Sequence, residues 1–394
     1  MMGVELAVRF RTQVVDWLAA GIRYEPRGDK VFTELCSRIG ACGIPLSRAT
    51  LHLRIHHPQW LGTRMTWLRG QKELGVETVA YDVAMTDAFL HSPFRVAIDS
   101  GKRVRQKLQI NGPHIFALYE ELKQTGQTDY VAYPLDHTQG RRHLLTFATD
   151  RSSGFSDQEL ALLDTILPWY SLVTEVRVKD QLVRTLLETY VGAQASEEIL
   201  HGAITRGSRK KIAAAILICD LRNFTRLSDR RPREELIGIL NSYFDIVAEP
   251  IEHYGGEILK FIGDGLLAVF PLDRPDACKR LLSSVRTCRA DALRLQAAGQ
   301  DIEFGIGVHL GEVWYGNIGS RKRLDFTVIG SAVNLAYKLE ALTKVLDHPV
   351  LLSEDFVNAA ACLDQTDYLG QQRISGLDVS IGVYAMRDNS HMSC

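Results

Sequence analysis

Two aspartates in the second half of the chain stand where chemistry on phosphates could occur. Asp220 follows the apolar run IAAAILIC, which is long enough for a central strand and too short for a typical helix. The segment RNFT (222–225) then leads toward a helix. It lies at the strand edge where ligands bind in α/β folds and where free backbone N–H groups can bind phosphate. Asp264 lies in a tight Ile-Gly-Asp-Gly turn, whose glycines let backbone and a metal ion approach closely.

These two carboxylates suit a hard divalent cation. Such ions bind carboxylate oxygens together with substrate phosphates, and paired ions activate an oxygen nucleophile and stabilise a leaving phosphate. Asp220 and Asp264, on neighbouring predicted strands beside a phosphate-binding turn, therefore predict a pair of magnesium-type ions.

A lysine stands four residues before the second aspartate, in the apolar hairpin GEILKFIGDGLLAVF (256–270). We expect both strands of this hairpin to be apolar on both faces, so a charge there is costly unless it is paired. One interpretation is a buried ion pair between Lys260 and Asp264. The other is that each charge finds its partner in a bound ligand, because residues of a turn project away from the strand face.

Length and composition indicate the number of domains and limit the kinds of partner. A chain of 394 residues predicts two domains and a connector. With 46 basic and 47 acidic side chains, the net charge gives no reason to expect a nucleic-acid partner or a membrane-attracted surface. No apolar run approaches the roughly 18 residues of a membrane span. The seven cysteines are scattered without a CxxC pair, which favours reduced thiols in a cytoplasmic protein.

Residues 1–170 mix predicted helices and strands. Strands are expected over 46–58, 129–135 and 143–150. Ser156 and Glu159 then form a capping box at the start of a helix. This end of the region resembles a GAF-type sensor domain, which implies a regulatory α+β domain that receives a small-molecule or protein signal.

The next stretch, 171–191, has apolar residues at heptad spacing with one interruption at Lys179. The pattern predicts a parallel dimer helix within a helical connector over 171–211. A helix packed on its own domain is the alternative interpretation. From 212 to 394 the predicted elements alternate as βαββαβα, the last of them a helix from about 331 to 344. This order indicates an α/β sandwich with helices on one sheet.

Four stretches in this second domain, CDLRNFT, GGEILKFIGDGLLAVF, GIGVHLGEVWYGNIGS and LDFTVIGSAVNLAYKLE, resemble the catalytic domain of class III nucleotide cyclases. The resemblance covers about residues 212–387. It implies a ferredoxin-like fold and a reaction that makes a 3′,5′-cyclic nucleotide and pyrophosphate from a nucleoside triphosphate. It also implies two metal ions, Mg²⁺ or Mn²⁺, at a head-to-tail homodimer interface.

The resemblance assigns roles near the first strand and the hairpin turn. Asp220 and Asp264 correspond to the metal-binding aspartates, and Leu221 would offer its backbone carbonyl to a metal ion. The phosphates would meet the backbone of four residues: Arg222, Asn223, Phe224 and Thr225.

Four further positions correspond to nucleotide contacts. Lys260 falls at the base-recognition lysine, which reaches into the active site of the partner chain. Thr327 occupies the position of the second base-recognition residue, which is a threonine in one bacterial subgroup. Asn334 and Lys338 match the pair that orients the ribose and stabilises the transition state. The ammonium of Lys260 can only donate, which suits N1 of adenine, and the Thr327 hydroxyl can accept from N6. The expected substrate is therefore ATP.

Two departures from the family pattern keep other functions open. Lys338 stands where arginine is usual, and it lacks the planar, multi-donor fork of a guanidinium. Ser375 stands where a lysine usually meets the triphosphate, and Arg373 on the same strand face is a candidate replacement. The expected function is an adenylate cyclase. The alternatives are a guanylate or mixed-specificity cyclase and a catalytically silent nucleotide-binding module. Stimulation by bicarbonate is a hypothesis carried by the threonine subgroup.

Overall fold

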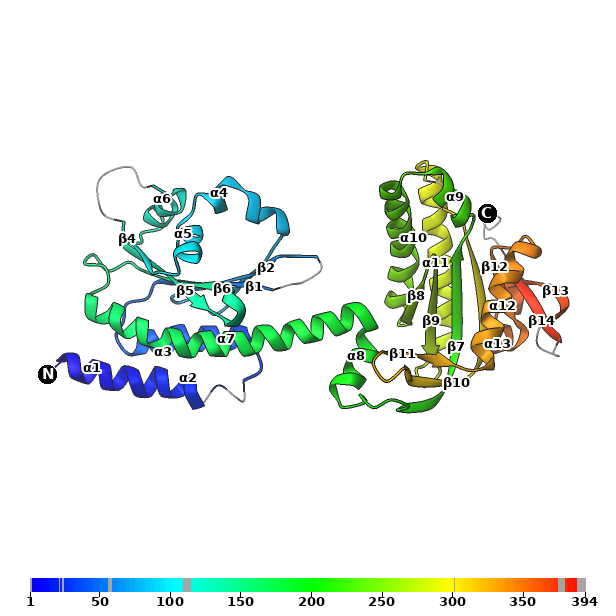
Figure 1. Ribbon diagram of the computed structural model, residues 1–394, viewed down its shortest axis with the longest axis horizontal. Helices are drawn as coiled ribbons and strands as arrows, with labels where there is room; N and C mark the ends of the chain where they lie inside the picture. Colours follow the sequence, from blue (N-terminus) through cyan, green and yellow to red (C-terminus); the bar gives the residue numbers. More distant parts are fainter. Residues whose placement is uncertain are drawn as a thin grey trace. The chain divides into compact units, whose positions relative to one another are not determined.

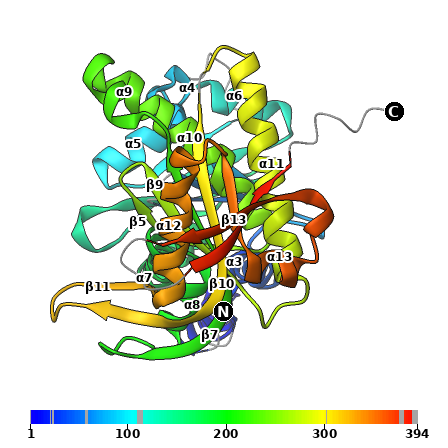
Figure 2. The ribbon, with the colours of Figure 1, turned by 90° about the vertical axis from the view of Figure 1, so that its right-hand side faces the viewer.

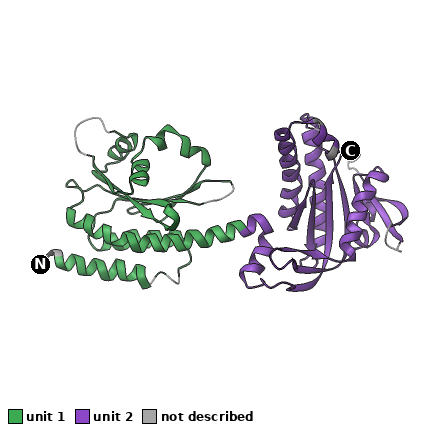
Figure 3. Cartoon of the chain, viewed as in Figure 1, with its two compact units in different colours: residues 1–186 green, residues 187–394 purple. Residues whose placement is uncertain are grey.

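The computed structural model describes residues 2–20, 22, 25–55, 59–108, 115–300, 302–374 and 380–387. The chain forms two compact units, residues 1–186 and 187–394 (Figure 3). The division falls inside the segment 171–211 that the sequence predicts as a connector. Within the described ranges, no helix has the length and apolar character needed to cross a membrane.

The first unit is built on an antiparallel sheet. Its described strands follow the order β3-β2-β1-β6-β5-β4. The strands are β1 (Arg48–Arg54), β2 (Gly62–Leu68), β3 (Gly75–Val79), β4 (Val104–Lys107), β5 (Asp129–Asp136) and β6 (Arg142–Thr149). All three strands that the sequence predicts are present, as β1, β5 and β6.

Helices cover both faces of this sheet (Figure 1). Alternate residues of β5 serve the two faces: Val131 and Tyr133 pack in one core with α3 and α7, whereas Tyr130 and Ala132 pack in another with α5 and α6. The helices are α1 (Met2–Phe10), η1 (Arg11–Val15), α2 (Asp16–Ala20), α3 (Gly28–Ala41), η3 (Tyr81–Met85), α4 (Asp87–Leu90), α5 (Pro93–Ser100), α6 (Ala117–Gln124), η4 (Thr138–Gly140) and α7 (Asp157–Val191). The likeness of this unit to a GAF-type domain stays a prediction.

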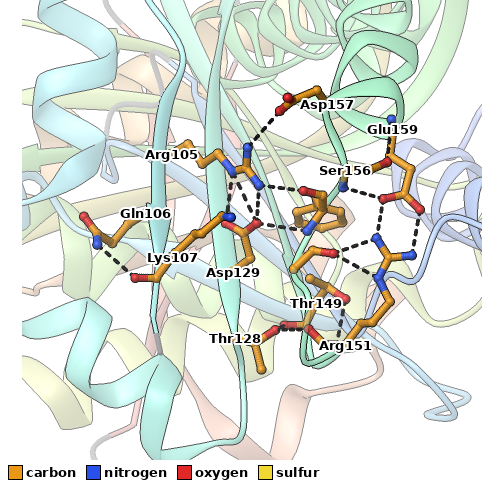
Figure 4. A network of polar contacts seen from close by, with 12 residues as sticks. Arg105, Gln106, Lys107, Thr128, Asp129, Thr149, Arg151, Ser156, Asp157 and Glu159 are labelled. Atoms are coloured by element: carbon orange, nitrogen blue, oxygen red, sulfur yellow. Dashed lines mark hydrogen bonds and ion pairs between the residues drawn. The ribbon is translucent and has the colours of Figure 1, made fainter. Parts of the chain in front are cut away.

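A polar network ties β4, β5 and the start of α7 together (Figure 4). The Asp129 side chain is fully buried and accepts hydrogen bonds from Arg105 Nη2 at 2.7 Å and from the Phe155 backbone N–H at 2.9 Å. The predicted capping box is confirmed next to it. The Glu159 N–H donates to Ser156 Oγ at 3.3 Å, and the Ser156 N–H donates to the Glu159 carboxylate at 2.7 Å.

The helix that follows runs without a break from Asp157 to Val191, through Pro168. The apolar positions of the predicted heptad seam are exposed in the single chain: Leu172, Val176, Val183, Leu186 and Tyr190. Lys179, which interrupts the seam, donates to Thr138 Oγ1 at 2.8 Å and pairs with Glu175 of its own helix. Among the described residues, the apolar seam therefore remains open to solvent, which is what a dimer helix requires.

The second unit is also built on one mainly antiparallel sheet, covered by helices on both faces. The described strands follow the order β13-β14-β12-β10-β7-β9-β8, and β11 pairs with β10. The strands are β7 (Arg209–Leu221), β8 (Glu257–Ile262), β9 (Gly265–Pro271), β10 (Phe304–Gly319), β11 (Leu324–Ile329), β12 (Val350–Ser353), β13 (Thr366–Arg373) and β14 (Ser380–Met386).

Alternation along the central strand β7 decides what each face carries. Ala215, Leu217 and Cys219 pack in a core with α10 and α11. Ala214, Ile216 and Ile218 pack in a core with α12 on the other face. Figures 1 and 2 show α10 and α11 on one side of the sheet and α12 on the other. The helices are α8 (Ala193–Leu200), α9 (Phe224–Arg230), α10 (Arg233–His253), α11 (Ala277–Ala297), α12 (Ser331–Val345), α13 (Glu354–Ala360) and η5 (Leu363–Gln365).

The mixed α/β class, the helices packed on one sheet and each predicted element of the second domain are confirmed. One expectation was wrong: the hairpin is not apolar on both strands. Strand β9 is buried throughout, whereas β8 lies at the edge of the sheet and is partly exposed. The Lys260 side chain is 41% exposed, so its charge does not carry the cost of full burial.

Replacing Asp129 with alanine should lower the free energy of unfolding of the first unit by about 3 kcal/mol. The change leaves a partly buried guanidinium and a buried backbone N–H without their acceptor. Asp150→Ala is the matched control, because its ion pair with Arg69 is exposed and should contribute less than about 1 kcal/mol.

Urea denaturation followed by tryptophan fluorescence measures this difference. In a Trp314→Phe background, the remaining tryptophans all lie within residues 1–186, so the signal reports the first unit. Equal denaturation midpoints for the Asp129 and Asp150 variants would contradict the stabilising role of the buried network.

Candidate functional site

The two predicted metal-binding aspartates lie side by side at one end of the sheet. Asp220, the next-to-last residue of β7, pairs in register with Gly265 of β9, immediately after Asp264. The Asp264 carbonyl accepts a hydrogen bond from the Leu221 N–H at 3.2 Å. A Cβ added at Gly265 would lie 3.1 Å from Asp220 Oδ1, so glycine leaves room for that carboxylate. Burial and then the charge of Asp220 raise the pKa of Asp264, which reflects how closely the two acids approach.

Helix α12 adds a third carboxylate and a cation to this end of the sheet. Even-numbered residues of β7 face α12, so Asp220 projects toward this helix and Leu221 into the opposite core. Lys344 Nζ lies 2.9 Å from Asp220 Oδ2 and 3.8 Å from Glu340 Oε1. The Glu340 oxygen Oε1 is buried without a hydrogen-bond partner. Burial raises the pKa of Glu340 to about 7, partly offset by Lys344.

The donor set fits a hard divalent ion. Asp220 and Asp264 supply carboxylates from neighbouring positions of β7 and the turn before β9, and the charge of one raises the pKa of the other. Leu221, the next residue after Asp220, adds a backbone carbonyl. Within the described ranges, no three His, Cys, Asp or Glu side chains form a metal-binding group. An ion at the two aspartates would therefore need backbone, water or substrate oxygens to complete its coordination.

The segment that follows β7 forms the predicted turn into a helix. Asn223 has a left-handed backbone conformation with φ 59°, which asparagine tolerates better than most residues, and α9 begins at Phe224. The Arg222 side chain extends to the C-terminal end of α12. Its Nη2 donates to the Thr343 carbonyl at 3.1 Å and to the His348 carbonyl at 3.3 Å. Arg222 thus ties the turn to the C-terminal end of α12. Its backbone N–H donates to the Glu303 carbonyl at 2.7 Å, so the predicted phosphate contact falls to the residues after it.

Lys260 pairs with a residue that sequence reasoning missed. Its Nζ lies 2.5 Å from Asp325 Oδ2 on β11, so the expected alternative of a Lys260–Asp264 ion pair was wrong. Thr327 follows two residues after Asp325 on the same strand, and residues i and i+2 share a face. Phe261, next to Lys260, packs edge to face against Phe244 of α10, with 4.7 Å between the ring centroids. The predicted base-recognition residues therefore come together on β8 and β11.

Asn334 and Lys338 are exposed on a different side of α12 from the one that meets Asp220. At about 100° per residue, they lie roughly 120° and 160° around the helix axis from Glu340. Within one chain, α12 therefore presents Glu340 and Lys344 to the aspartates, and turns Asn334 and Lys338 toward solvent.

Arg373 lies exposed at the end of β13. Strands β14, β12 and β10 separate β13 from β7, which corresponds to about 19 Å of sheet at the usual strand spacing. The single chain does not bring Arg373 beside Asp220. Ser375 lies outside the described residues.

Three residues at the site were not found by sequence reasoning: Asp325, Glu340 and Lys344. A signal for Asp325 existed, because an acid two positions before Thr327 on a strand must share its face. Glu340 and Lys344 stand four residues apart on a predicted helix, so a shared face was foreseeable, but their meeting with Asp220 depends on how α12 packs on β7.

Comparison with known proteins finds relatives of the second unit. Residues 208–378 match the family model of the adenylate and guanylate cyclase catalytic domain. An uncharacterized protein of Mycobacterium tuberculosis is 31% identical over 195 residues, covering 48% of this chain and 35% of the relative. An adenylate cyclase of Anabaena cylindrica is 28% identical over 217 residues, covering 53% of this chain and 43% of the relative. The chain thus spans less than half the length of these curated relatives.

Solved structures of cyclases resemble the same part of the chain. The adenylyl cyclase CyaB from P. aeruginosa has 26% identity and a TM-score of 0.41, covering 46% of this chain and 97% of that chain. The guanylyl cyclase Cya2 has 31% identity and a TM-score of 0.40, covering 45% of this chain and 93% of that chain. On the strength of the family match and the ordered motifs, residues 208–378 are a class III adenylate and guanylate cyclase catalytic domain.

Proposed function

We propose that the protein is an adenylate cyclase that converts ATP to 3′,5′-cyclic AMP and pyrophosphate. The observation that carries the proposal is the pair of adjacent carboxylates, Asp220 and Asp264, at one end of the sheet of a cyclase-family domain. In the proposed reaction, the ribose 3′-oxygen attacks the α-phosphate in line.

The chain's own residues would hold and orient the nucleotide. Asp220, Asp264 and the carbonyl of Leu221 would hold two divalent ions, Mg²⁺ or Mn²⁺. When bound, such ions lower the pKa of the ribose hydroxyl and neutralise charge on the leaving pyrophosphate. The backbone N–H groups of residues 223–225 would donate to the phosphates, since the Arg222 N–H donates to the Glu303 carbonyl and its side chain to the end of α12.

Base selection would come from β8 and β11. Lys260 can donate to N1 of adenine, and the hydroxyl of Thr327 can accept from its N6 amino group. The Lys260–Asp325 ion pair supports this assignment, because it holds the lysine beside the strand that carries Thr327. A threonine hydroxyl can also donate, so the discrimination against GTP is expected to be incomplete.

A complete site would require a second copy of the chain. Asn334 and Lys338 face away from the aspartates of their own chain, and Arg373 lies on a distant strand. In a head-to-tail dimer, these residues would meet the nucleotide held by the partner's aspartates. Exposed apolar side chains beside the base-recognition strands support such an interface: Phe261, Ile262, Trp314 and Ile329.

The first unit would regulate the catalytic domain through α7. The exposed heptad seam of this helix offers a second contact between two copies, and the helix continues without a break from the first unit to Val191. A change in the pairing of two such helices could alter how the catalytic domains meet.

Cyclic AMP formation from ATP with Mn²⁺ or Mg²⁺ tests the proposed reaction. Asp220→Asn should lower kcat/KM by at least about 100-fold, because it removes one of two charged metal ligands. Asp273→Asn, in the exposed loop after β9, is the matched control and should leave the activity unchanged. Product from GTP alone would support a guanylate cyclase instead. A folded dimer that binds ATP but forms no product would identify a silent binding module.

Lys260→Glu should shift the ratio of kcat/KM for ATP over GTP toward GTP by about tenfold. A carboxylate cannot donate to N1 of adenine but can accept from guanine. The matched charge reversal Lys322→Glu lies in the exposed loop before β11 and should leave the ratio unchanged. If the Lys260 variant keeps the wild-type ratio, this lysine does not read the base.

A further inference from the structure

Lys344 occupies an unusual position for a side chain that the proposed reaction does not use. It extends from α12, one helical turn after Glu340, and its Nζ lies 2.9 Å from Asp220 Oδ2. The Lys344 side chain is 49% exposed, and that of Asp220 is 28% exposed. The contact is therefore a partly solvated ion pair made directly to a proposed metal ligand.

The surroundings explain why a cation is stable there. Asp220, Asp264 and Glu340 place three acidic side chains at this end of the sheet, and Glu340 is 93% buried with an oxygen that has no hydrogen-bond partner. Lys344 reaches both Asp220 and Glu340, at 2.9 Å and 3.8 Å. It thus supplies positive charge where closely spaced carboxylates would otherwise repel each other.

A divalent ion and the ammonium of Lys344 cannot share this position freely. Both would bind the Asp220 carboxylate, and two cations within a few ångströms repel each other strongly in a partly buried site. The lysine has a flexible four-carbon stem, so its ammonium can move into solvent without disturbing the core of the domain.

We propose that Lys344 is a tethered counter-ion of the metal site: it neutralises Asp220 and Glu340 when no metal ion is bound, and a divalent ion must displace it from Asp220 in order to bind. This inference rests on the proposed metal-binding role of Asp220 and Asp264. It implies that free metal ions bind weakly, and that a metal–nucleotide complex binds better because its triphosphate offers the displaced ammonium a new anionic partner.

Binding of Mn²⁺ to the nucleotide-free full chain, followed by the electron paramagnetic resonance signal of free Mn²⁺, tests the proposal without any turnover. Lys344→Gln should tighten Mn²⁺ binding by about fivefold, the scale of one partly screened charge interaction. Lys344→Met, which keeps the apolar stem, should act in the same direction. Lys344→Arg keeps the charge and should stay near the wild type. Lys279→Gln removes an exposed lysine that pairs with Asp276 and should have no effect.

The Asp220→Asn variant distinguishes a wrong counter-ion role for Lys344 from a wrong metal site at Asp220. If Asp220→Asn weakens Mn²⁺ binding but both neutral Lys344 variants leave it unchanged or weaken it, the counter-ion role is wrong while the metal site stands. If Mn²⁺ binding responds to neither position, or no protein binds the ion measurably, the metal site is wrong and the proposal falls with it.

Discussion

The close approach of Asp220 and Asp264 is the constraint on which the rest of the catalytic unit depends. Two carboxylates at the end of adjacent strands repel each other, and the charge of Asp220 contributes to the raised pKa of Asp264. Three features make this arrangement stable: Gly265 leaves space for the Asp220 carboxylate, the Asp264 carbonyl accepts from the Leu221 N–H, and Lys344 supplies a cation. The same repulsion makes the position favourable for a divalent ion.

The alternation of β7 connects this constraint to the fold. Because one face of the strand packs on α10 and α11 and the other on α12, Asp220 projects toward α12 while Leu221 enters the opposite core. Arg222 then fixes the end of α12 to the turn after β7. The helix is held so that Lys344 meets Asp220, and this orientation turns Asn334 and Lys338 outward. Under the proposed function, the same packing would leave each single chain with an incomplete active site.

Local patterns in the sequence predicted most elements of the second unit and the residues placed at its site. The run before Asp220, the glycine turn around Asp264 and the periodicity of 331–344 depend on neighbours in sequence, so they were readable. The contacts of Lys260 were not, because its partner Asp325 lies 65 residues away and β8 was not recognisable as an edge strand. Lys344 was missed for the same reason: its contact with Asp220 spans 124 residues.

The central claim is that one active site forms from two copies, with the aspartates from one and Asn334 and Lys338 from the other. Co-expression of Asp220→Asn with Asn334→Ala, followed by measurement of cyclic AMP formation, tests it most directly. Each variant alone should be nearly inactive. The mixture should recover about a quarter of wild-type activity, since about half of the dimers are mixed and each has one intact site. A mixture that stays as inactive as its two components, with mixed dimers present, would contradict the shared site.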